Sequence, residues 1–134
     1  METIICIQGP SQTGKTPTIR DVYAKLSKSV WPKEGDFCCI VNYKNVKVGF
    51  FSIGDPGYKQ YETIKSHIEN DCEIILCACR SWGHTQNDIE RVAKEFDYKL
   101  IYASTYRSKN VNIDFIRKQF VSAIINLIDS CIIK

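Results

Sequence analysis

The chain has 134 residues, of which 44% are hydrophobic and 25% charged, and these values predict one globular domain over residues 1–134 rather than a disordered or fibrous chain. The net charge is only +3, which argues against a nucleic-acid partner because such domains carry a basic stripe. No apolar run approaches the roughly 20 residues of a membrane-spanning helix, and the N-terminus lacks a signal-peptide pattern. We therefore expect a cytoplasmic protein that does not enter a membrane, with an oligomeric state that the sequence leaves open.

The seven cysteines are an odd number, and most lie within apolar runs, which is typical of a reducing compartment. None has the spacing of a zinc site. We interpret them as small buried hydrophobic residues. They are Cys6, Cys38, Cys39, Cys72, Cys77, Cys79 and Cys131.

The first half of the chain begins with a β-branched apolar run over 3–8, which predicts a strand buried on both faces. An apolar stripe from Ile19 to Val30 predicts the helix that follows. Two further strands are predicted over 37–43 and 46–53, and the two-residue connection between them requires an antiparallel hairpin. A turn at 54–57 ends this part.

The second half alternates helices and strands. Apolar spacing predicts helices through 61–68 and 89–96, strands over 73–79 and 99–103, and a last helix that begins after Asn112, a plausible N-cap. This order predicts an α/β fold with a mostly parallel five-stranded sheet, one antiparallel hairpin strand, and helices on both faces in a three-layer arrangement.

One motif carries chemistry. The eight residues between the first strand and the first helix match G-x-x-x-x-G-K-[ST] in full. They are Gly9, Pro10, Ser11, Gln12, Thr13, Gly14, Lys15 and Thr16. Glycines let backbone N–H groups converge on phosphate oxygens, and the helix N-terminus adds positive potential. Lys15 would bridge the β- and γ-phosphates, and the Thr16 hydroxyl would ligate Mg²⁺.

Residues 3–30 resemble the Walker A unit of the P-loop nucleoside triphosphatases, and the order of the later elements is similar to that superfamily. The resemblance implies a P-loop fold and the use of ATP or GTP with Mg²⁺. The apolar strand before Asp55 resembles a Walker B strand, which implies that Asp55 holds Mg²⁺ beside Thr16. An Asp that simply begins the Asp-Pro-Gly turn is a compatible alternative.

Several motifs of particular families are missing. Pro56 stands where helicases and AAA-type ATPases place a water-activating Glu, and Tyr58 stands where signalling GTPases place a Gly. A guanine-reading Asn-Lys-x-Asp is also absent. The sequence therefore favours ATP over GTP.

A second segment of interest follows the strand that ends at Cys79. Arg80 is a candidate to stabilise charge during phosphoryl transfer, His84 or Gln86 to orient water, and Trp82 to stack on a base. For Arg80 and His84 the alternative is an exposed residue in a solvated βα loop, and for Trp82 it is a ring that simply caps the core. Arg107 and Lys109 could belong to a short kinase lid, or to an ordinary solvated loop.

The leading hypothesis is binding and slow hydrolysis of a nucleoside triphosphate, with Lys15, Asp55 and Arg80 as the catalytic candidates. Two alternatives stay open. One is a kinase that passes the γ-phosphate to a small acceptor, and the other is a non-catalytic nucleotide-dependent switch that acts through a protein partner.

Overall fold

The computed structural model describes residues 2–8, 15–29, 38–52, 60–79, 84–106 and 109–132. Its strands are β1 (Thr3–Gln8), β2 (Cys38–Tyr43), β3 (Val46–Phe51), β4 (Ile74–Cys79) and β5 (Lys99–Ser104). Its helices are α1 (Lys15–Ser27), α2 (Gln60–Glu69), α3 (His84–Glu95) and α4 (Ile113–Ile132). Among the described residues, no helix is long and apolar enough to cross a membrane.

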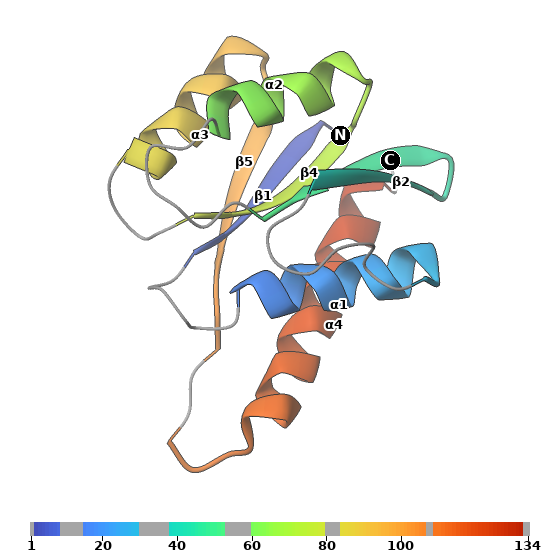
Figure 1. The fold of residues 1–134 in the computed structure, drawn as a ribbon, viewed down its shortest axis with the longest axis vertical. Helices are drawn as coiled ribbons and strands as arrows, with labels where there is room; N and C mark the ends of the chain where they lie inside the picture. The colour runs from blue at the N-terminus through green and yellow to red at the C-terminus, as the bar shows by residue number, and fades with distance from the viewer. Residues whose placement is uncertain are drawn as a thin grey trace.

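The five strands form one mixed sheet in the order β2-β3-β4-β1-β5 (Figure 1). The pairs β3–β4, β4–β1 and β1–β5 are parallel, and only β2–β3 is antiparallel. The predicted mostly parallel sheet with an antiparallel strand at its edge is therefore confirmed. β4 lies between β1 and β3, so the ends of β1 and β3 do not adjoin directly.

The β2–β3 hairpin turns through Lys44 and Asn45, which have φ angles of 50° and 65°. Two consecutive left-handed residues make a type I′ turn, whose twist matches that of the flanking strands. The turn fixes the pairing of Tyr43 with Val46 and of the residues behind them, which confirms the predicted hairpin.

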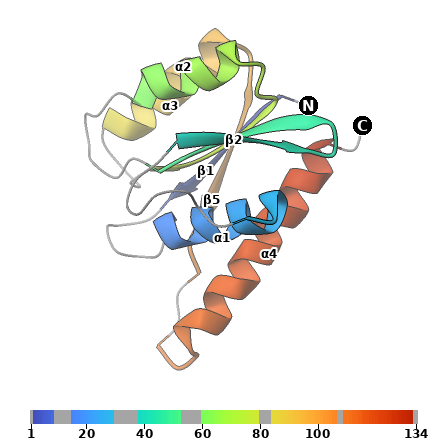
Figure 2. The ribbon, with the colours of Figure 1, turned by 45° about the vertical axis from the view of Figure 1, so that its right-hand side comes forward.

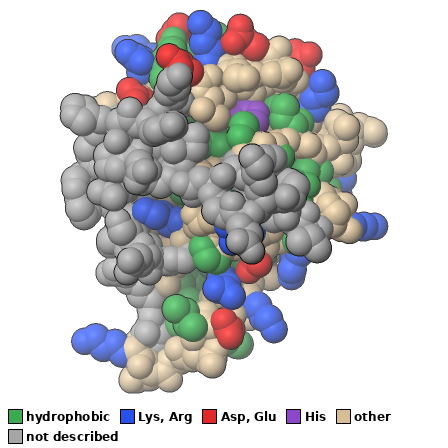
Figure 3. All heavy atoms as spheres, in the orientation of Figure 1, with side chains coloured by type: hydrophobic (Ala, Val, Ile, Leu, Met, Phe, Trp, Pro, Cys, Tyr) green, Lys and Arg blue, Asp and Glu red, His purple; other side chains and the backbone are tan. Residues whose placement is uncertain are grey.

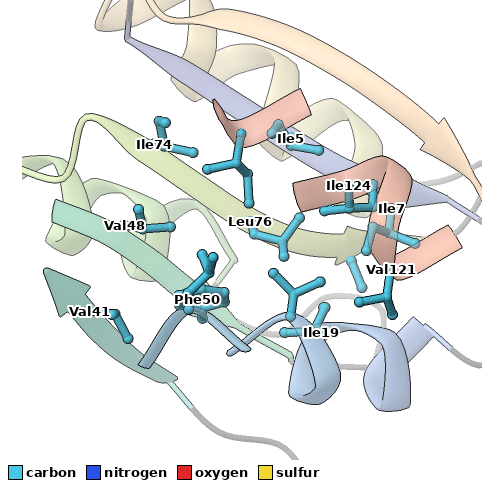
Figure 4. Packing of buried hydrophobic residues seen from close by; sticks show 14 of the residues in the cluster. Ile5, Ile7, Ile19, Val41, Val48, Phe50, Ile74, Leu76, Val121 and Ile124 are labelled. Carbon is cyan, nitrogen blue, oxygen red and sulfur yellow. The ribbon is translucent and has the colours of Figure 1, made fainter. Parts of the chain in front are cut away.

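Two clusters of buried side chains flank the sheet. Figures 1 and 2 show α1 and α4 together on one side of the strands and α2 and α3 together on the other. The first cluster joins sheet residues to α1 and α4 (Figure 4), and the second joins sheet residues to α2 and α3. Neighbouring strand residues alternate between them, so Phe50 belongs to the first cluster and Phe51 to the second.

The sequence predicted the start of α4 correctly but not the end of α1. Asn112 is confirmed as the N-cap of α4, since its Oδ1 accepts hydrogen bonds from the N–H groups of Asp114 (2.8 Å) and Phe115 (3.4 Å). The prediction that the first helix reaches Val30 was wrong. α1 ends at Ser27 because Lys28 turns to a left-handed φ of 58°.

Candidate functional site

The site that the sequence predicts lies where strand ends meet the start of α1. Gln8, the last residue of β1, is in register with Cys79 at the end of β4 and with Ser104 at the end of β5. These three parallel strands therefore end together at one edge of the sheet. Ligands bind at such an edge in open α/β folds.

Lys15 and Thr16 are the first two residues of α1, at the N-terminal end, where the helix dipole favours an anion and the backbone N–H groups have no acceptor within the helix. The first turn of α1 contains no acidic residue that would oppose one. Pro17 in this turn removes an N–H that has no partner within the helix, so it does not disrupt α1. Gly9, Pro10, Ser11, Gln12, Thr13 and Gly14 lie outside the described residues.

A short side-chain contact joins the start of α1 to β3. The hydroxyl oxygens Oγ1 of Thr16 and Oγ of Ser52 are 2.6 Å apart and share a hydrogen bond. Ser52 directly follows β3 and is 1% exposed, so its hydroxyl is held inside the protein. Ser52 was missed as a site residue, although a hydroxyl at the carboxyl end of an apolar strand was a usable signal.

Most of the other side chains that the sequence predicts for the site are not among those the structure describes. Asp55, Arg80, Trp82 and Arg107 lie outside the described residues, as do the side chains of His84 and Gln86. The backbone of His84 begins α3, and Lys109 is exposed in the connection from β5 to α4.

A second group of polar side chains lies beside the hairpin. Its Cys38, at the start of β2, is exposed, so the expectation that all the cysteines are buried was wrong for this residue. The His67 Nε2 atom is 3.3 Å from the Cys38 Sγ atom and 3.2 Å from the Phe50 carbonyl oxygen. Burial raises the pKa of the Cys38 thiol and lowers that of His67, so near neutral pH both groups are uncharged and Cys38 is a weak nucleophile. Cys39 points to the other face and packs against the first cluster, as neighbouring strand residues must.

The described side chains were also compared with the ligand sets of metal sites and with the basic stripe of nucleic-acid-binding domains. No three His, Cys, Asp or Glu side chains there come close enough to hold a metal ion. Among the described side chains visible in Figure 3, Lys and Arg are spread over the surface and not gathered into one stripe.

A comparison of the chain with protein-family models finds no family that matches, and a comparison with curated proteins finds no relative.

Proposed function

We propose that the chain binds a nucleoside triphosphate with Mg²⁺ through residues 9–16 and hydrolyses it slowly, as a single three-layer domain similar to the P-loop nucleoside triphosphatases. The observation that carries this proposal is the 2.6 Å contact between Thr16 and Ser52. Thr16 carries the hydroxyl that the motif assigns to the metal. Ser52 directly follows β3, and Asp55 comes three residues later in the sequence. The contact supports the proposal because it sets Thr16, the last residue of the motif, beside the end of β3.

The hydroxyl of Thr16 and the carboxylate of Asp55 are the kinds of oxygen donor that Mg²⁺ prefers over nitrogen or sulfur. If Thr16 donates its proton to Ser52, its lone pairs remain free for the cation. Thr16 and Asp55 would hold the metal, and Lys15 would neutralise the phosphates. Bound Mg²⁺ would offset the charge that develops on the transferred phosphoryl group.

Slow turnover is expected for a chemical reason. Pro56 follows Asp55, so the position that carries the water-activating Glu in the helicase and AAA-type pattern has no general base. Arg80 is the candidate for charge stabilisation in the transition state. ATP is favoured over GTP because the sequence lacks the guanine-reading motif.

Thermal unfolding in the presence of ATP, GTP, ADP and GDP, each with and without Mg²⁺, tests the proposal. A nucleotide at 100 times its Kd adds about 2.7 kcal/mol of stability, which raises Tm by several degrees in a chain of this size. Lys15→Ala should abolish the shift. Lys25→Ala, in the last turn of the same helix, should keep it.

The variant Ser52→Ala distinguishes the contribution of the metal to nucleotide binding from that of the phosphates. It should reduce the part of the shift that depends on Mg²⁺ and leave the Mg²⁺-free part unchanged, because Ser52 orients Thr16 and contacts no phosphate. The absence of any shift with all four nucleotides in the wild type would refute the proposal.

A further inference from the structure

The N-terminal end of α4 projects beyond α1 and away from the sheet (Figures 1 and 2). The helix runs over Ile113–Ile132, and its buried residues all lie between Phe120 and Cys131. Residues 113–119, about 10 Å of helix, include no buried side chain. The start of α4 therefore stands out from the body of the protein.

Exposed apolar side chains gather at this projecting end. Among the described residues, the large hydrophobic side chains that are exposed number five, and all but Ile40 lie within residues 106–115. These four, which we call the tip residues, are Tyr106 (51% exposed), Val111 (46%), Ile113 (73%) and Phe115 (55%). Single hydrophobic residues scattered over a surface are ordinary, whereas a group of them marks an interaction surface.

The same segment carries the excess positive charge of the chain. Residues 105–118 contain four basic residues and one acidic residue, a surplus that equals the net charge of +3 of the whole sequence. Arg117 is paired with carboxylates, whereas Lys109 and Lys118 are exposed and form no ion pair with a described carboxylate. The positive end of the helix dipole lies here too. The charge of this surface is therefore complementary to an anionic partner.

The arrangement of the tip residues favours a fluid partner over a rigid one. Ile113 and Phe115 are two residues apart on α4, about 200° around the helix axis, so their side chains project from nearly opposite sides. A flat protein face would cover only one of them, and a stable protein interface takes about 20–30 residues from each partner. Like charges also oppose contact between two copies of this end. A lipid headgroup layer can surround the end of the helix on all sides.

We propose that the start of α4 binds the surface of an anionic lipid bilayer. The tip residues reach the boundary between headgroups and acyl chains, a favourable place for Tyr and Phe rings, and Lys109 and Lys118 attract the anionic headgroups. Contact of this depth is reversible and requires no membrane-spanning helix. It does not rest on nucleotide binding, so its test can fail without affecting the proposed function.

Co-sedimentation with lipid vesicles tests the inference. At low salt, the wild type should bind vesicles of phosphatidylcholine with about 30% phosphatidylserine, should not bind phosphatidylcholine alone, and should dissociate as salt screens the charges. Phe115→Ala should weaken binding by roughly five- to fifteenfold, because about half of an aromatic side chain no longer leaves water. Lys109→Ala should weaken it by roughly fivefold.

Two matched controls lie outside the tip. Ile40→Ala truncates an apolar side chain 40% exposed on β2, and Lys94→Ala removes an exposed cation from the last turn of α3. Neither should change vesicle binding. The proposal is refuted if the wild type does not bind phosphatidylserine vesicles at low salt, or if Phe115→Ala and Lys109→Ala bind them as the wild type does. A dimer that Phe115→Ala dissociates, in a chain that binds no vesicles, would instead make the tip a self-association surface and also refute it.

Discussion

His67 is a buried histidine that three parts of the fold enclose. It is 3% exposed on α2, and its ring lies against Phe51 at a centroid distance of 6.2 Å. Gly49 of β3 leaves space for the ring, since a Cβ there would lie 2.9 Å from His67 Cγ. A protonated imidazole would have to lose its hydration in this site, and burial accordingly lowers the pKa of His67 below its ordinary 6.5.

This shift predicts a pH dependence of stability. The unfolded chain binds a proton at His67 near pH 6.5 and the folded chain does not, so the contribution is fully present above pH 6.5. It is lost as the pH falls toward the folded pKa, at up to about 1.4 kcal/mol per pH unit. Urea unfolding of the wild type at pH 8, 6.5 and 5.5 should show this loss, and His67→Gln should flatten it.

His84 is the other histidine of the chain, so His84→Gln measures the remaining histidine contribution in the same pH range. Working above pH 5 keeps most carboxylates ionised in both states. Equal slopes for the wild type and His67→Gln would show that the folded protein protonates His67 as readily as the unfolded chain does.

At the scale of the element, α4 begins at a defined cap. Besides the two hydrogen bonds to the Asn112 side chain, the Asn112 carbonyl oxygen accepts the first intrahelical bond from the N–H of Ile116 at 3.1 Å. Asn112→Ala should lower the free energy of unfolding by about 1 kcal/mol, because these N–H groups lose their partner. Urea unfolding measures the loss.

Asn126→Ala is the matched control for the cap. Asn126 is an exposed Asn within the same helix, where alanine has the higher helix propensity. This substitution should leave stability unchanged or raise it slightly. Equal losses in the two variants would mean that the cap contributes nothing beyond propensity.

The sequence predicted the elements better than their mutual arrangement. Each strand and helix could be predicted because apolar spacing and turn residues determine structure locally. The hairpin turn at Lys44 and Asn45 is an example. Strand order is set by tertiary packing, so no local pattern could place β4 between β1 and β3. For the same reason the motif identified Thr16, whereas its partner Ser52 and the exposed tip residues at the start of α4 became visible only in the fold. The roles of Asp55 and Arg80 stay predictions.

At the scale of the whole molecule, one sheet contributes to both hydrophobic clusters. Phe50 and Phe51 are each 0% exposed and belong to different clusters. Phe50 meets the ring of Tyr23 from α1 edge-on, at 5.6 Å and 87°. Because the strands are shared, loss of packing in either cluster weakens the sheet on which the other depends. The chain should therefore unfold as one unit.

Phe50→Ala and Phe51→Ala test this coupling. Each should cost about 3–5 kcal/mol, a large share of the roughly 5–15 kcal/mol that stabilises an ordinary domain. In both variants, urea transitions followed by far-UV circular dichroism and by tryptophan fluorescence should shift together and stay coincident. Ile40→Ala, which truncates a side chain 40% exposed on β2, should shift them much less. Loss of part of the helical signal at lower urea in only one variant would contradict the coupling. It would mean that the helices of one cluster detach while the other cluster and the shared sheet remain folded.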